Sequence, residues 1–566
     1  MTAGHATEET PLVIGDGALA DSRSRADLEQ AVSLTKHDEQ SESESHGQVC
    51  GDVWSAVSPW TTLQAILFRK RSCGSFGELD GLRALAFVWV FTFHVHLHEL
   101  GLLHLPRGLT SVILQGGDGG VTLFLVLSGF LLAHIFSGLL ARQPSGVSAY
   151  GRFIYRRFAR VYPALIMGVF ISVGAYSELA GFGWWSACDQ KRARLPSIFG
   201  FLQANGLGYI MLANALFVAN DIHWECGAAD PPWTVSVEFQ FYLLLPLLVC
   251  AFHWQRWLGA SLALAAFALS AAFRGSWTAE DLVTSQDLGR RRYPRHFSWL
   301  LSEYVCGVIA YMAVSDLGLG WEGGGAGRGG AAGGGGLRPA TDSLVGAAPM
   351  AAASSKATTP MGLLRWRIPR TDMLAVLLVQ LLWLISAIAY LCLVLTDDTK
   401  GDNSTIRYTL IAFDNRHSVI NVLLAVSTAL LIVASCAPAV MPPGSEHGDR
   451  DSHSDQPAAD RAILYYITYV VSVPVRLTCA ALRSPVLYPL ASVSYTAYLL
   501  QAPFYSHKLI LQKGGGANDG WQYLGALCTC LGFGLLLSLL VERPCMNLLH
   551  MVDPFAQNGK NGGKGR

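Results

Sequence analysis

The chain has 566 residues, of which 51% are hydrophobic and only 14% are charged. Together with a mean hydropathy of +0.34, this composition indicates that much of the chain lies in lipid. The 41 basic and 41 acidic residues balance each other, which argues against a general affinity for nucleic acid.

The N-terminal arm, residues 1–75, is expected to be disordered and cytosolic. It carries Glu8, Glu9 and Asp16 among many serines and glycines. It lacks the basic start and short apolar run of a secretory signal.

Apolar stretches long enough to cross the roughly 30 Å hydrocarbon core recur along the rest of the chain. They predict an all-α, polytopic membrane protein with about ten transmembrane helices. The expected spans are residues 82–104, 119–140, 161–179, 236–253, 257–273, 297–315, 373–395, 418–438, 486–504 and 521–541. Two more apolar segments, 197–219 and 463–482, are predicted to be re-entrant or interfacial.

The spans divide the chain into two membrane parts. Residues 76–315 hold the first six spans, and residues 372–545 hold the last four. A glycine-rich segment, 316–371, is expected to join them as a flexible cytosolic linker. Residues 546–566 are predicted to form a cytosolic tail.

Basic residues beside the spans predict the orientation, because cytosolic loops concentrate Lys and Arg. With the N-terminus in the cytosol, most basic clusters fall inside, whereas the arginines at 290–295 fall outside. Asn403 begins an Asn-Ser-Thr glycosylation sequon in a loop predicted to be lumenal. The sequon and the acidic arm indicate a eukaryotic endomembrane or plasma membrane, with both termini in the cytosol.

His94 is the first candidate functional residue, because titratable groups inside apolar spans are costly and rare. It follows Arg83 by eleven residues, which on a helix sets the imidazole about 16 Å deeper. A histidine there can accept the proton of an alcohol near neutral pH. A packing histidine and a metal ligand, with His98 on the same face and His96 on another, are the alternatives.

Arg157 and Arg160 lie three residues apart, on one helix face, just before a span. Such a pair can clamp phosphates through charge-assisted hydrogen bonds. The alternative is ordinary anchoring of a helix end by positive charge.

Cys188 and Cys226 lie in the long loop between the third and fourth spans, which the orientation puts in the lumen. They are the one cysteine pair expected in an oxidising compartment, and we predict a disulfide between them. Two free thiols are the alternative.

Glu238 enters a strongly apolar helix after the Pro231-Pro232-Trp233 turn. A carboxylate at that position needs either a partner or a function. The alternative is that Glu238 lies at the interface and caps the N-terminus of the helix.

Six segments together resemble the acyltransferase-3 family of membrane acyltransferases, from Leu79 to Pro544. They are Leu79–Arg83 with His94, Gly120–Phe130, Arg157-x-x-Arg160 with Pro163, Trp233–Pro246, Ser494–Leu499 and Glu542-Arg543-Pro544. Thr234 stands where the family has a serine, and Gln501 stands where many relatives have a histidine. The arm and the glycine-rich linker have no counterpart in compact bacterial members.

The resemblance implies transfer of an acyl group, often acetyl, from cytosolic acyl-CoA to a hydroxyl of a glycan, lipid, sterol or small metabolite. No bound cofactor or metal is expected, and acyl-CoA is the co-substrate. We expect His94 to act as general base, Glu238 to orient or charge-stabilise it, and Arg83 to position the first helix or the donor. Arg157 and Arg160 would hold the donor's phosphates. The competing classes are a transporter or lipid-handling protein on the same fold and, less well matched, a non-catalytic receptor.

Overall fold

The structure is a computed structural model of the full chain. It describes residues 58–67, 77–98, 117–143, 145–180, 212–219, 233–275, 297–317, 370–395, 415–436, 458–501, 504 and 519–555. Contacts divide the chain into Met1–Thr62 and Leu63–Arg566. The site described below belongs to the second unit alone.

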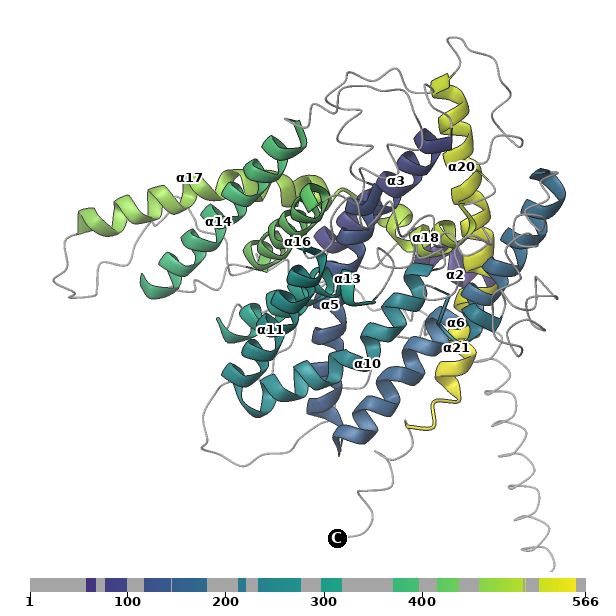
Figure 1. Ribbon diagram of the computed structural model, residues 1–566, viewed down its shortest axis with the longest axis horizontal. Coiled ribbons are helices and arrows are strands. Elements are labelled where there is room, and N and C mark those ends of the chain that lie inside the picture. The colour runs from purple at the N-terminus through teal and green to yellow at the C-terminus, as the bar shows by residue number, and fades with distance from the viewer. Residues whose placement is uncertain are drawn as a thin grey trace, which may run out of the picture. The chain divides into compact units, whose positions relative to one another are not determined.

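All regular elements in these described ranges are helices, which confirms the all-α prediction (Figure 1). They are α2 (Pro59–Leu67), α3 (Gly77–His98), α5 (Gly117–Arg142), α6 (Gly146–Ala180), α10 (Trp233–Trp254), α11 (Arg256–Gly275), α13 (Phe297–Asp316), α14 (Arg370–Leu395), α16 (Asn415–Cys436), α17 (Ala458–Leu482), α18 (Leu487–Leu500), α20 (Asp519–Leu537), the π-helix η4 (Ser538–Glu542) and α21 (Arg543–Met551).

Seven of these helical segments are long and apolar enough to cross a membrane, within the part of the chain that the structure describes. An eighth span results if α17 and α18, which meet at a 68° bend, are counted together. The predicted re-entrant segment 463–482 forms most of α17. Each of the ten predicted spans overlaps a helix, but α3 and α6 do not meet the criterion, so the number ten remains a prediction.

Helices α5 and α13 form the centre of the packing. A Cβ at Gly129 of α5 would collide with the Tyr304 carbonyl oxygen, and one at Gly307 of α13 would collide with the Val126 carbonyl oxygen. Small residues at such crossings let membrane helices approach closely. Tyr304 is fully buried and its ring stacks on Phe241 with centroids 4.4 Å apart.

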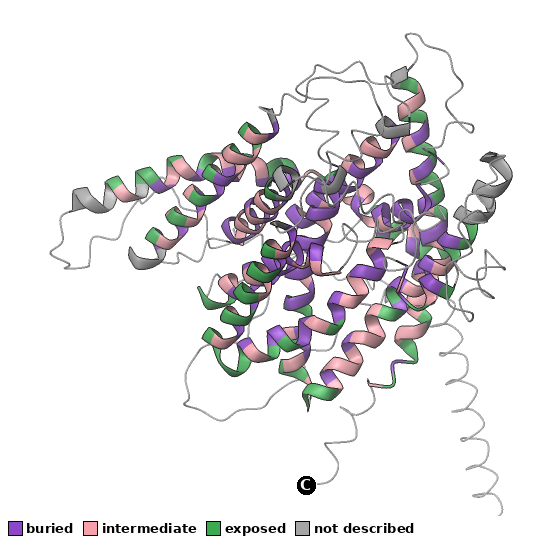
Figure 2. Ribbon diagram, in the orientation of Figure 1, coloured by how far each residue is buried: buried purple, intermediate pink, exposed green. Residues whose placement is uncertain are grey.

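Burial decreases from this centre towards the outer helices (Figure 2). On α11, Leu264 and Leu269 are exposed, and on α14, Leu378 and Ile385 are exposed. Large apolar side chains directed outward on long apolar helices match a lipid environment, because lipid imposes no cost for their exposure.

Candidate active site

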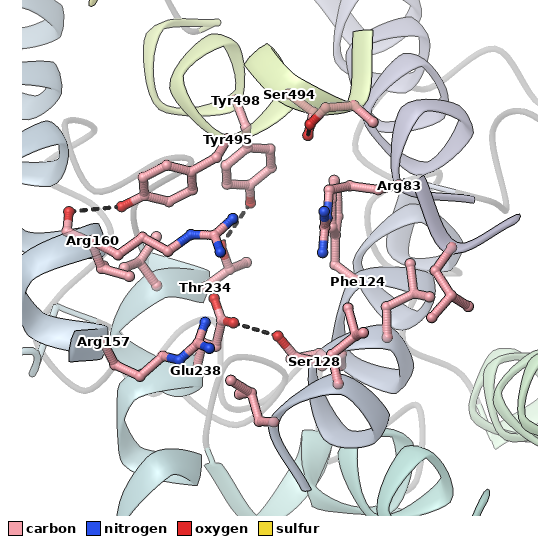
Figure 3. Close-up of a pocket in the computed structure, with 18 of the residues that line it drawn as sticks. Arg83, Phe124, Ser128, Arg157, Arg160, Thr234, Glu238, Ser494, Tyr495 and Tyr498 are labelled. Atoms are coloured by element: carbon pink, nitrogen blue, oxygen red, sulfur yellow. Dashed lines mark hydrogen bonds between the residues drawn. The ribbon is translucent and has the colours of Figure 1, made fainter. Parts of the chain in front are cut away.

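A cavity of about 330 Å³ lies among α3, α5, α6, α10, α18 and η4. This volume falls in the range of small-molecule pockets, roughly 300–1,000 Å³. Figure 3 shows charged and aromatic side chains from these elements directed into it. Four of the predicted site residues line it: Arg83, Arg157, Arg160 and Glu238.

The apolar wall of the cavity comes from α5. Leu125, Leu131, Leu132 and Ile135 lie along it, spaced so that they repeat on one helix face. The charged groups come from the other helices, so the cavity has one apolar side and one polar side.

Arg157 and Arg160 reach the cavity from α6, as their three-residue spacing predicts. The Arg157 guanidinium lies 6.0 Å from the centre of the Phe153 ring, at the distance of a cation–π contact. Arg83 enters from the opposite side, on α3, and Asp80 one turn earlier lies 3.6 Å from it. Figure 3 shows the guanidinium groups of Arg83 and Arg160 facing each other across the cavity.

The two preceding arginines of α6 have another partner. Arg152 Nε donates to Asp553 Oδ2 at 3.0 Å, and Arg156 Nε lies 3.4 Å from the same oxygen. The Tyr155 hydroxyl donates to the carbonyl oxygen of Leu549 at 2.7 Å. This cluster, which we call the C-terminal latch, holds the chain after α21 against the start of α6. Arg152 and Arg156 therefore bind the C-terminal segment, whereas Arg157 and Arg160 line the cavity.

Phe555 completes the latch. A Cβ at Gly151 would lie 2.7 Å from the Phe555 ring, so the absence of a side chain at Gly151 gives the ring its place on α6. The backbone N–H of Phe555 donates to Asp553 Oδ1 at 3.0 Å and orients the carboxylate. Residues 546–555, assigned from the sequence to the tail, therefore include the end of α21 and an ordered contact with α6.

Glu238 lies inside the helix bundle. Its Oε1 accepts a hydrogen bond from the Ser128 hydroxyl of α5. The carboxylate thus has a partner on a neighbouring helix, and the alternative of a capping residue at the membrane interface does not describe this contact.

His94 lies on α3 but is not among the residues that line the cavity. Its Nδ1 is 2.8 Å from the Val90 carbonyl oxygen, and its ring meets Phe93 edge-on with centroids 5.4 Å apart. A carbonyl oxygen only accepts, so Nδ1 carries the hydrogen, and in the neutral ring Nε2 holds the lone pair. This tautomer suits a base. The side chains of His96 and His98 lie outside the described residues.

The cavity lining includes further polar residues to which the sequence assigned no role. The Thr234 hydroxyl donates to the Tyr498 hydroxyl oxygen at 2.9 Å, and the Tyr495 hydroxyl donates to the Val161 carbonyl oxygen at 3.0 Å. Glu542, in the π-turn η4, lines the cavity and accepts from the Ser538 hydroxyl at 2.7 Å. Short π-helical segments often mark functional sites, but the periodicity of the sequence does not reveal them.

Two predicted sites lie outside the described residues. They are the disulfide between Cys188 and Cys226 and the glycosylation site Asn403. Both remain predictions.

Comparison with known proteins bears out the family resemblance over part of the chain. The family model of the acyltransferase-3 group, described as an acyltransferase domain, matches residues 76–333. This region belongs to the acyltransferase-3 family. The match covers α3, α5, α6 and α10 of the cavity wall, whereas α18 and Glu542 follow it in the chain.

Three known proteins match part of the chain, and two of them are named as an acetyltransferase or acyltransferase. The chain is 26% identical over 182 residues to a peptidoglycan O-acetyltransferase, OatA, of Listeria monocytogenes, covering 31% of this chain and 24% of that protein. It is 28% identical over 218 residues to nodulation protein 10 of Rhizobium leguminosarum bv. viciae, covering 37% and 52%. It is 30% identical over 183 residues to the acyltransferase MdmB of Streptomyces mycarofaciens, covering 30% and 38%.

The chain therefore spans between a quarter and about half of the length of these relatives. No solved structure matches it.

Proposed function

We propose that this chain is a membrane O-acyltransferase that moves an acyl group, acetyl in the simplest case, from cytosolic acyl-CoA to an acceptor hydroxyl. The observation that carries the proposal is the convergence of Arg83, Arg157 and Arg160 on one cavity within an acyltransferase-3 region. Guanidinium groups bind phosphates through paired, charge-assisted hydrogen bonds.

The lining suits a donor with an anionic end and an apolar end. The three arginines would face the phosphates of the donor, and the apolar α5 wall of Leu125, Leu131 and Ile135 borders the remaining space. The lining also contains the carboxylates of Asp80, Glu238 and Glu542, whose negative charges balance those of the arginines. Preorganised arginines would then lose little freedom when phosphates bind.

His94 would act as general base. The acceptor hydroxyl oxygen attacks the thioester carbonyl carbon while His94 Nε2 takes the hydroxyl proton. The carbon–sulfur bond then breaks, and the leaving thiolate of coenzyme A takes the proton from the imidazolium. The hydrogen bond from Nδ1 to the Val90 carbonyl oxygen supports this role, because it orients the ring and keeps the hydrogen of the neutral imidazole on Nδ1.

Arg83 and His94 are separated by about 16 Å along α3. A donor whose phosphates lie among the arginines would reach towards His94 with its long pantetheine arm. Glu238 bonds to Ser128. Glu238 would place a negative charge beside Arg157 on the polar side of the cavity. That Glu238 orients His94 stays a prediction.

The acceptor is proposed to be the hydroxyl of a glycan, a lipid or a small metabolite. The relative named as a peptidoglycan O-acetyltransferase supports a glycan within this range. The protein is proposed to lie in a eukaryotic endomembrane or plasma membrane with both termini in the cytosol.

The test is release of coenzyme A from acetyl-CoA by membranes that contain the protein. An acyltransferase releases coenzyme A when acceptor is present, and acceptor gains the mass of an acyl group. A transporter on the same fold moves solute across sealed vesicles without consuming acetyl-CoA, and that result would replace the proposal.

A further inference from the structure

One layer of side chains lies near one end of the cavity. Tyr498 of α18 contacts both Thr234 of α10 and Phe124 of α5 (Figure 3). The Tyr498 hydroxyl bonds to Thr234 at 2.9 Å, and the Tyr498 ring meets Phe124 edge-on with centroids 6.0 Å apart. We call these three residues the Tyr498 layer.

The position of the layer follows from helix register. Phe124 and Thr234 each precede by four residues, one helical turn, a member of the Ser128–Glu238 hydrogen bond. The layer therefore lies about 6 Å from that bond along the helices. Among the described residues, Tyr498 is the last lining residue on α18 and Thr234 is the first on α10, whereas on α5 the lining continues about one turn further, to Val121. The layer therefore lies near this end of the cavity.

His94 lies beyond this layer. Gly120 of α5 lies against Ala86 and Val90 of α3. Ser128, later on α5, shares the cavity with Arg83, earlier on α3, so the two helices run antiparallel. Gly120 precedes Phe124 by one helical turn, and His94 follows Val90 by one turn. Because the helices are antiparallel, both steps lead in the same direction, away from the layer. The imidazole is therefore about 12 Å beyond the layer, measured along the helix axes.

From this arrangement we infer that the Tyr498 layer is a gate between the donor cavity and His94. The inference rests on the proposed function. With the layer closed, a thioester in the cavity does not meet the base. With the layer open, the pantetheine arm passes and the acyl group reaches His94. Gates of this kind protect reactive groups from water until the acceptor is in place.

The gate predicts a specific side reaction when it is removed. In Tyr498→Ala the thioester reaches His94 without acceptor, and water takes the acceptor's place. The water oxygen adds to the carbonyl carbon, the carbon–sulfur bond breaks, and the products are a carboxylic acid and the free thiol of coenzyme A. His94 transfers the proton from water to sulfur.

The experiment uses the full-length protein purified in detergent, with acetyl-CoA as the only substrate. We expect Tyr498→Ala to hydrolyse acetyl-CoA about tenfold or more faster than the unaltered protein, because gating has been lost. Tyr498→Ala combined with His94→Ala should return to the unaltered rate. This dependence on His94 separates a lost gate from general loosening of the fold.

Matched variants sharpen the result. Tyr488→Ala makes the same change on the same helix, where the hydroxyl bonds to the Ala65 carbonyl oxygen away from the cavity, and it should not raise hydrolysis. Tyr498→Phe and Thr234→Val each remove one partner of the hydrogen bond between Thr234 and Tyr498. They should raise the rate of acetyl-CoA hydrolysis equally, and by less than Tyr498→Ala does. Unequal increases in this rate would show that the hydrogen bond does not keep the gate closed.

The outcomes for the gate and for the proposed function are distinguishable. If membranes with the unaltered protein transfer acetyl groups but Tyr498→Ala hydrolyses no faster, the gate is overturned and the proposed function stands. Faster hydrolysis that persists without His94 also overturns the gate. If neither protein releases coenzyme A under any condition, both inferences fall.

Discussion

Removing the negative charge of the C-terminal latch should release α21 from α6. Asp553→Asn keeps the size of the side chain but replaces the carboxylate that Arg152 and Arg156 share. Both arginines then lose a charged partner, and the amide offers only a neutral acceptor oxygen. Because Arg157 and Arg160 follow on the same helix, a loosened latch should also disturb the cavity wall.

The size of the effect follows from exposure. The side chain of Asp553 is 2% exposed and that of Arg152 is 17% exposed, so their bond at 3.0 Å is shielded from water. Arg156 is 41% exposed and 3.4 Å away, so its share is smaller. A shielded hydrogen bond to a charged group contributes about 1.5–3 kcal/mol, and we expect a loss of about 2 kcal/mol. Local opening should then become about 30-fold more frequent.

Amide hydrogen exchange of the peptide covering residues 543–555 measures this opening in the purified protein. Asp316→Asn is the matched control, because Asp316 pairs with Arg256 in an ion pair whose side chains are 57% and 62% exposed. The control should change exchange by less than about twofold. Unchanged exchange at 543–555 in Asp553→Asn, or equal acceleration in every helix, would refute the reasoning.

Three further predictions follow from the cavity, the helix packing and the sequence. Arg157→Ala with Arg160→Ala should weaken acetyl-CoA binding about tenfold or more while changing saturated turnover less, which a donor titration measures; equal binding would contradict the clamp. Gly307→Leu should prevent α13 from packing on α5 and lower the thermal stability and yield of the purified protein, whereas an unaltered melting curve would contradict the close contact. Cys188 and Cys226 should react with a thiol label only after reduction, and equal labelling with and without reductant would exclude the disulfide.

The helices of this protein could be predicted largely from hydrophobic stretches. Apolar length defines a membrane helix well, because every backbone polar group must bond within the helix. The shared face of Arg157 and Arg160 could also be predicted, since a three-residue spacing is a local property. Glu238 could be singled out because a charge among apolar residues is costly, and the structure gives it a hydrogen-bond partner, Ser128, on a neighbouring helix.

The partners of these residues could not be predicted. Asp553 meets Arg152 across 401 residues of sequence, and Ser128 meets Glu238 across 110. Membrane helices are apolar on nearly all faces, so the pattern does not say which face meets which neighbour. The spacing of Arg83 and His94 predicted depth along one helix, but it contained no information about the contact between Thr234 and Tyr498 on two other helices.

The most direct test of the central claim is transfer of isotopically labelled acetyl from acetyl-CoA to endogenous acceptor, compared in membranes with equal amounts of the unaltered protein and His94→Ala. We predict that the unaltered protein labels an acceptor and that His94→Ala lowers the rate about 100-fold or more, the contribution typical of a general base, while acetyl-CoA still binds. Transfer by His94→Ala at the rate of the unaltered protein would contradict the mechanism, and absence of labelled acceptor with either protein would contradict the proposed activity.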